Sequence, residues 1–349
     1  MAVPTAEQHL RFLANLQRLL DEGAFVATYK FALLMALADL AVERGDDSNA
    51  PLTLHVRDIA EKFIAYYWRQ SLPYPAAGRS PAVLKQNTGE QAAILKAIAA
   101  ARKKYGGSLA RARADARQWA VLVRAVATVV RVMPLWKLQT VGGEKVSFLY
   151  PNAGRGSTIE LLPGVAAGFR KFHPLIRSVV QGEWIRQVRG IAANQPVLGQ
   201  RAELGEFLFG SDRAPLNVYR PLLQDLQGDR CFYCRRRFTG GIDVDHFIPW
   251  SRYPVDLAHN FVLAHAGCNS RKKDYLAAAA HAERWVRRNR EQAGSLAERF
   301  DRAGLFHDLN VSAQVARWAY GQAAEADADT WVSDHHFEKL PPGLFKSWS

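Results

Sequence analysis

Hydrophobic side chains recur every three or four residues over much of the first half of the chain, the pattern of helices with one buried face. The first such helix ends near Gly23, a second runs over about 25–42, and a third covers about 52–70. The leucines that share a face of the first helix are Leu10, Leu13, Leu16 and Leu20. The aromatic residues 66–68 end the third helix, and we expect them to pack in the core; the alternative is stacking on nucleic-acid bases.

Two further helices are predicted at about 89–105 and 108–132, after a loop at 71–89 that is rich in Pro and Gly. The second helix is basic, and its arginines recur every seven residues, which places them along one face. These residues are Arg117, Arg124 and Arg131. The row either follows the phosphates of a nucleic acid or forms an ordinary solvated face, and the sequence leaves both interpretations open.

Apolar residues alternate on both sides of Gly142-Gly143, which predicts a β-hairpin over about 135–150. Helices are predicted again at about 170–192, 276–303 and 312–324. An irregular stretch near 193–215 suits a domain boundary. We therefore predict a mainly α fold with a small α+β module. The expected domains are a helical domain at 1–195, the α+β module at 196–280 and a C-terminal helical extension at 281–349.

The composition indicates a folded protein with a polyanionic partner. The chain has 349 residues, 48% of them hydrophobic and 23% charged, so it can bury more than one core and is not disordered as a whole. The net charge of +13 favours nucleic acid as a partner, ahead of an acidic membrane surface. The longest apolar stretch, 31–42, is too short to cross a membrane. No secretory signal is recognisable, so we expect a cytoplasmic protein with no membrane contact.

The cysteines point to a metal site. There are three of them, an odd number for a disulfide framework, and all lie between residues 231 and 268. Cys231 and Cys234 form one pair of potential ligands, and His265 and Cys268 form a second pair with the same spacing. Four such ligands suit tetrahedral zinc and leave no position open for water, so we expect this zinc to be structural. The alternative is that the cysteines are ordinary buried residues.

The segment between and beside these pairs resembles the HNH endonuclease family. The residues that carry the resemblance are Asp245-His246, Pro249, Asn260 and Cys268-Asn269. It covers about 220–280, and we attach no family to the remainder. Two positions depart from the common pattern, because His265 stands where zinc-bearing members usually have cysteine and Asn269 where many have histidine. Both replacements keep a residue that can hold a metal.

The resemblance implies a ββα module, with strands at about 241–247 and 261–264 and a helix that begins near Cys268. It also implies that one Mg²⁺ or Mn²⁺ is held by Asp245 and Asn269, since both offer the hard oxygen ligands that these ions prefer. Asn260 corresponds to the central asparagine of the family, which orients the loop between the strands.

The residue types also suit the hydrolysis of a phosphodiester bond when they are considered without the family resemblance. Imidazole exchanges protons near neutral pH, which suits His246 as the general base that takes a proton from water. Asp243 stands two residues before Asp245 and can face the same side of a strand. It is either an outer carboxylate that orients a ligand or a structural residue. We assign no role to His259.

Basic residues near the module are expected to contact phosphates without reading a base sequence. The expected nucleic-acid-binding residues are Arg236, Arg252, Arg271, Lys272 and Lys273, together with Arg117 and Arg124 of the helical domain.

These features predict a metal-dependent HNH endonuclease that cuts DNA, duplex DNA first, by a one-metal mechanism. The alternatives are an RNA-cleaving enzyme with the same chemistry and a zinc module that binds nucleic acid without cutting it. The combination of Asp245, His246 and Asn269 favours an enzyme, because a binding module needs none of the three. Family analogy connects a large attached region with restriction or anti-phage defence. A protein partner or a homo-oligomer is left open.

Overall fold

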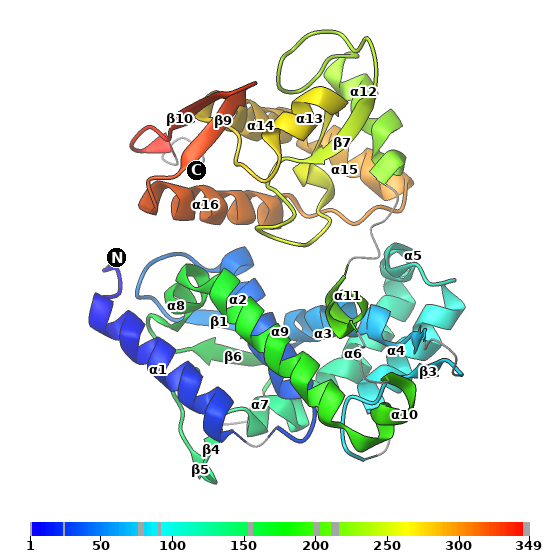
Figure 1. Ribbon diagram of the computed structural model, residues 1–349, viewed down its shortest axis with the longest axis vertical. Coiled ribbons are helices and arrows are strands. Elements are labelled where there is room, and N and C mark those ends of the chain that lie inside the picture. Colours follow the sequence, from blue (N-terminus) through cyan, green and yellow to red (C-terminus); the bar gives the residue numbers. More distant parts are fainter. Residues whose placement is uncertain are drawn as a thin grey trace. The chain divides into compact units, whose positions relative to one another are not determined.

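The chain divides into two compact units, Met1–Ser211 and Asp212–Ser349, in a computed structural model that describes residues 2–23, 25–75, 80–89, 92–152, 156–198, 203–210 and 216–344 (Figure 1). Helices dominate both units, and the described strands form sheets of two strands each. The mainly α fold with a small α+β part is thereby confirmed. The division lies at 211/212 and not at 195/196, and the C-terminal helices form one unit with the metal-ligand segment. The predicted boundary stretch near 193–215 lies partly outside the described residues.

The helices of the first unit follow the predicted periodicity. They are α1 (Ala6–Glu22), α2 (Tyr29–Arg44), α3 (Val56–Gln70), α4 (Ala93–Lys104), α5 (Leu109–Ala114), α6 (Ala116–Val132), α7 (Pro134–Lys137), α8 (Val165–Lys171), α9 (His173–Gly190), α10 (Gln195–Leu198) and α11 (Leu204–Phe209). The single helix predicted at 108–132 is two helices. Asp115 ends α5 and caps α6, because its side chain accepts a hydrogen bond from the backbone N–H of Gln118.

Among the described residues, three antiparallel strand pairs complete the first unit. They are β1 (Leu52–His55) with β6 (Thr158–Leu161), β2 (Pro73–Tyr74) with β3 (Ala82–Val83), and β4 (Thr140–Val141) with β5 (Glu144–Lys145). The hairpin around Gly142-Gly143 is confirmed, and both glycines have the positive φ angles that its turn requires. It is shorter than predicted, because Trp136 lies in α7.

Helix α2 is the centre of the first unit, and its residues from Lys30 to Glu43 are buried. Helices α3, α7, α8 and α9 pack around it. Tyr67 and Trp68 of α3 are buried in the same core, which confirms that the aromatic end of α3 is a packing feature.

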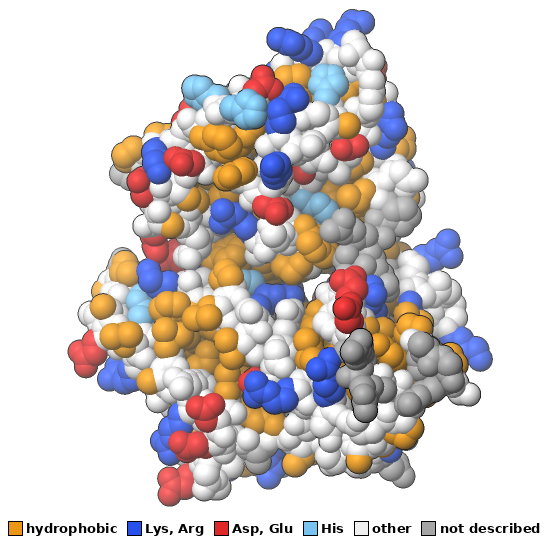
Figure 2. Space-filling view, in the orientation of Figure 1, with side chains coloured by type: hydrophobic (Ala, Val, Ile, Leu, Met, Phe, Trp, Pro, Cys, Tyr) orange, Lys and Arg blue, Asp and Glu red, His pale blue; other side chains and the backbone are white. Residues whose placement is uncertain are grey.

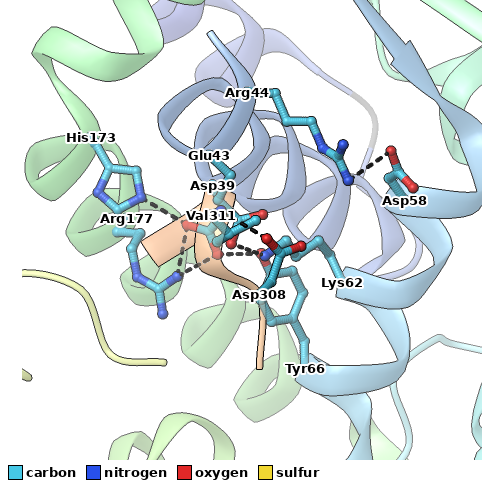
Figure 3. Close-up of polar contacts among 10 residues, drawn as sticks. All are labelled: Asp39, Glu43, Arg44, Asp58, Lys62, Tyr66, His173, Arg177, Asp308 and Val311. Atoms are coloured by element: carbon cyan, nitrogen blue, oxygen red, sulfur yellow. Dashed lines mark hydrogen bonds and ion pairs between the residues drawn. The ribbon is translucent and has the colours of Figure 1, made fainter. Parts of the chain in front are cut away.

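A central helix that is buried all round must neutralise its own charges internally. Asp39 of α2 accepts hydrogen bonds from Tyr66 of α3 at 2.6 Å and from Arg177 of α9 at 3.0 and 3.1 Å, and its Oδ1 lies 2.7 Å from Nε2 of His173 (Figure 3). Burial opposes ionisation of Asp39, but the charge of Arg177 and the hydrogen bond with His173 outweigh it and hold the pKa of this carboxyl group well below its usual range.

One helical segment, Ala116–Lys137, is long and apolar enough to cross a membrane by length and composition. This corrects the expectation that no segment reaches that length. The apolar side chains of Leu122, Val126 and Val130 face the core of the first unit, and only a third of the segment's most apolar window is buried. Lys and Arg side chains are spread over the visible surface of both units (Figure 2).

The second unit places a small sheet among helices. Its elements are η2 (Leu216–Tyr219), α12 (Arg220–Gln227), β7 (Ile242–His246), η3 (Ala258–Asn260), β8 (Phe261–His265), α13 (Ala266–Lys272), α14 (Ala279–Glu291), α15 (Ala293–Arg302), α16 (Leu309–Glu325), β9 (Asp329–Ser333) and β10 (His336–Lys339). The hairpin of β9 and β10 lies in a segment for which we predicted no strands.

We predict that Asp39→Asn destabilises the first unit by about 3–5 kcal/mol at neutral pH, because the charge of Arg177 is then buried without its carboxylate. The pKa of Asp39 is depressed in the fold, so its stabilising effect is present above the ordinary Asp pKa and is lost as pH falls below about 4. The difference in the free energy of unfolding between wild type and Asp39→Asn should therefore become smaller in acid. Differential scanning calorimetry measures both effects. Glu22→Gln, which breaks the exposed pair with Arg18, is the control and should change stability by less than about 1 kcal/mol.

Candidate metal and catalytic centre

The predicted ββα arrangement is present. Strands β7 and β8 pair antiparallel, with Asp245 opposite Val262 and His246 opposite Phe261. Helix α13 follows β8 directly and packs against both strands. Because side chains alternate along a strand, Asp243 and Asp245 lie on one side of β7.

The four predicted zinc ligands come together. The ligand atoms of Cys231, Cys234, His265 and Cys268 all lie within 4.8 Å of one another. The turn after Cys231 is closed by a hydrogen bond from the N–H of Arg235 to the carbonyl of Cys231, and Arg235 has a positive φ of 64°. The other two ligands lie at the end of β8 and in the first turn of α13.

The hydrogen bonding of His265 and the closeness of the three cysteine sulfurs both favour the binding of a metal ion by these ligands. Nε2 of His265 lies 3.1 Å from the carbonyl oxygen of Arg237, to which it donates, so Nδ1 is left as the ligand atom. Burial, and then the neighbouring sulfurs of Cys231 and Cys234, raise the pKa of Cys268 to about 12. Three thiolates this close repel one another, and a bound cation removes that repulsion. Three thiols and an imidazole at this separation fit Zn²⁺.

Asp245 is held from two sides. Its Oδ2 accepts a hydrogen bond from the hydroxyl of Tyr233 at 2.5 Å and lies 3.1 Å from Nζ of Lys272. Tyr233 stands between the two cysteines of the first ligand pair. The turn that carries these ligands therefore also positions the hydroxyl group that donates to Asp245.

Lys272 differs from our expectation that it binds nucleic acid. It is fully buried, and its Nζ also donates to the carbonyl oxygen of His246 at 3.0 Å. Its ammonium group therefore positions the Asp245-His246 pair and is not presented to a phosphate.

Asn269 and Asp243 are in direct contact. Nδ2 of Asn269 donates to Oδ2 of Asp243 at 3.0 Å. Asp243 and Asp245 lie on one side of β7, and α13, which carries Asn269, packs against that strand. Two carboxylates and an amide oxygen are a donor set that fits Mg²⁺ or Mn²⁺. The direct contact of Asn269 is with Asp243, which gives Asp243 a place in the site.

His246 has a carboxylate partner that we did not predict. Its Nε2 lies 2.9 Å from Oδ1 of Asp256, in the loop between β7 and β8. The ring is also in edge contact with Trp250 and Phe261. The carboxylate fixes the tautomer with the proton on Nε2, and this leaves Nδ1 as a proton acceptor. A carboxylate four residues before Asn260 was the available signal in the sequence.

Asn260 organises the same loop. Its Oδ1 accepts from the N–H of Ile248 at 2.8 Å, and its Nδ2 donates to the carbonyl of Ile248 at 2.9 Å. This is the orienting contact that we expected of it.

The C-terminal helix α14 supports the site through hydrogen bonds to the backbone at the start of β8. Arg288 of α14 is buried and donates to the carbonyl oxygens of Phe261 and His259 at 2.8 and 2.7 Å. Trp285 donates to the same carbonyl of His259 and stacks on Phe247. The ring of His259 is buried beside Phe300, in keeping with its lack of an assigned role.

The other predicted nucleic-acid-binding residues have different environments. Arg236 and Lys273 are exposed, Arg252 is half-buried, and Arg271 forms an ion pair with Asp334. The remaining two, Arg117 and Arg124, are exposed on α6 of the first unit.

Two family models match the chain. The first, described as HNH endonuclease, matches residues 235–278. The second, described as a domain of unknown function, DUF8808, matches residues 9–206. No curated protein and no solved structure matches the chain. The HNH match covers the strands, the loop and the second ligand pair, and it confirms the resemblance seen in the sequence.

We predict that the purified chain holds one zinc ion and that Cys231→Ser or His265→Ala removes it and unfolds the second unit, since zinc binding to such sites contributes directly to folding. Mass spectrometry of the bound metal and circular dichroism measure the two effects. His265→Cys is the matched control, because it keeps a zinc ligand, and it should retain the metal. Full zinc content in His265→Ala would contradict this ligand set.

Proposed function

This chain belongs to the DUF8808 family and carries an HNH endonuclease module in its second unit, and we propose that it hydrolyses the phosphodiester bonds of DNA. The observation that carries the proposal is the grouping at the end of β7. There the imidazole of His246 lies 2.9 Å from the carboxylate of Asp256, Asp245 precedes it on β7, and Asn269 donates to Asp243 of the same strand.

His246 is the proposed general base. Asp256 holds its Nε2–H, so Nδ1 takes the proton from the attacking water. Among the residues that the structure describes, none is recorded as hydrogen-bonded to this nitrogen, and the side chain is partly exposed. Trp250 and Phe261 restrict the ring, which lowers the cost of aligning it with a phosphate.

Asp245 and Asn269 are the proposed ligands of a catalytic Mg²⁺ or Mn²⁺, and Asp243 orients Asn269 or joins them. When bound, such an ion neutralises charge on the phosphate and stabilises the departing oxygen. Lys272 and Tyr233 fix the position of Asp245, so that the carboxylate needs little rearrangement to hold the ion. The zinc ion has no part in the chemistry, because all four of its positions are filled by the protein.

DNA is the proposed substrate, and duplex DNA the first form to test, because the HNH family resemblance favours DNA while the chemistry of the site is indifferent to the sugar. A role in restriction or anti-phage defence in the cytoplasm is a further proposal. It rests on the analogy between the large DUF8808 region and the accessory regions of other nucleases.

We predict that the wild-type chain nicks or cuts plasmid DNA in the presence of Mg²⁺ or Mn²⁺, and that His246→Ala lowers the rate by about 10²–10⁴-fold through loss of the general base. Gel analysis of supercoiled plasmid measures the rate, and zinc content and circular dichroism should be unchanged. His335→Ala, at an exposed position, is the control and should cut normally. Equal cutting by wild type and His246→Ala would refute the assignment. Faster cutting of RNA than of DNA of equal sequence would make RNA the substrate.

We predict that Asp256→Asn lowers kcat by about 10²-fold or more with little change in KM, because an amide no longer favours the Nε2–H tautomer of His246. Single-turnover cleavage of a labelled duplex measures the rate of the chemical step. Asp256→Glu keeps the charge and should recover part of the rate. If Asp256→Asn changes only the thermal stability, Asp256 has a structural role alone.

A further inference from the structure

A large excess of positive over negative charge lies in one part of the first unit. Residues 93–137, which form α4 to α7, contain ten Lys and Arg and a single acidic residue, Asp115. This local excess of nine charges is most of the chain's net charge of +13. A concentration of this kind on adjacent helices is the electrostatic footprint of a polyanion-binding surface.

Seven basic side chains of this region are exposed: Lys96, Lys103, Lys104, Arg111, Arg117, Arg124 and Lys137. We call five of them, Lys103, Lys104, Arg111, Arg117 and Arg124, the α4–α6 basic face. Among the residues that the structure describes, no ion pair is recorded for any of the five. Some exposed arginines elsewhere in the chain differ in this respect. Arg57, Arg186 and Arg302 each have a carboxylate within 4 Å.

The one acidic residue of the region is already engaged in holding the helices together. Oδ1 of Asp115 accepts from the N–H of Gln118 at 3.1 Å, and its Oδ2 accepts from the hydroxyl of Tyr105 at 2.7 Å. These bonds join the end of α4 to the start of α6. Trp68 of α3 donates to the carbonyl oxygen of Gly107 at 2.8 Å and attaches the α4–α5 turn to the core. The basic face is therefore carried on fixed helices.

The arrangement of charges suits a phosphate backbone. Arg117 and Arg124 are seven residues apart on α6, which places them about 10 Å apart along one face of the helix. The positions exposed between them and beyond, such as Val121 and Thr128, are neutral. Figure 2 shows Lys and Arg side chains that project from the edge of the first unit where Figure 1 places α4 and α5.

A membrane surface suits this face less well. A helix that lies in a membrane interface buries a continuous apolar face with large side chains. The apolar face of α6, with Leu122, Val126 and Val130, is already buried in the protein core. What α6 presents outward is a row of arginines, with exposed apolar residues at Val121 and at the end of the helix, Val132 and Met133.

We propose that the α4–α6 basic face binds the phosphate backbone of duplex DNA and retains the substrate on the chain while the nuclease module acts. Binding through phosphates is independent of base sequence, because contacts with the phosphate backbone carry no sequence information. The retention of substrate rests on the proposed nuclease function, whereas DNA binding by this face does not.

The test uses the full chain with His246→Ala, so that DNA is bound without being cut. Lys104→Gln, Arg117→Gln and Arg124→Gln are combined in that background, and the matched control combines Arg57→Gln, Arg186→Gln and Arg302→Gln, which removes the same charge elsewhere. Fluorescence anisotropy with a labelled 30-base-pair duplex is measured from about 50 to 200 mM salt. We expect the first set to weaken binding about tenfold or more and to reduce the salt slope by about 2 to 3, since each lost phosphate contact removes roughly 0.9 from it. The control set should lose much less affinity for the duplex, and its salt slope should change less.

Equal losses in the two sets would overturn the proposal, because they would reflect net charge alone. Unchanged binding by the first set would overturn it as well.

Sedimentation with vesicles that contain phosphatidylserine, and anisotropy with a duplex RNA of equal length, complete the test. Preference for either over DNA, lost in the first set alone, would assign the face to that partner instead. A wild-type chain that cuts no DNA but shows the predicted binding loss would refute the nuclease proposal and leave this one standing. Melting temperatures close to that of the parent chain verify that all the variants are folded.

Discussion

Every candidate catalytic residue of the second unit lies on or beside a sheet of only two strands, and such a sheet is marginally stable in water by itself. The geometry of the site therefore depends on what is attached to β7 and β8. The four zinc ligands connect one end of the sheet to α13, Asn260 closes the loop at the other end, and Arg288 and Trp285 of α14 hold the start of β8 through backbone carbonyl groups. The C-terminal helices thus belong to the nuclease unit for a physical reason, since they supply the core that two strands cannot.

The metal-ligand turn and the catalytic residues are linked by direct contacts. Tyr233 lies inside the first ligand pair and donates to Asp245, while Lys272 follows the second ligand pair by one helical turn and bonds both Asp245 and the backbone of His246. A structural ion that shapes this turn also sets the position of the carboxylate. Zinc bound by these four ligands would therefore also influence the position of the Asp245 carboxylate.

The first unit is organised differently, around a helix that water does not reach. Burial of α2 requires its acids to be paired, and Asp39 with Arg177 and Glu43 with Lys62 supply those pairs. Other positive charges are exposed on α4 to α6, among them Lys103, Lys104, Arg111, Arg117 and Arg124. The interior pairs stabilise the fold, and the unpaired exterior charges are available for a partner.

The features that depend on local spacing could be predicted from the amino-acid sequence: the helical periodicity, the paired zinc ligands, the order of Asp245, His246, Asn260 and Asn269, and the turn at Gly142-Gly143. The contacts between residues far apart in the chain could not, and they became visible in the fold. The fold paired β1 with β6, brought Asp256 to His246, placed Asp243 against Asn269, and buried Lys272 where a surface cation was expected. The reason is physical, because spacing along a chain reports the period of one helix or strand, while the partner of a buried charge is chosen by the packing of several elements at once.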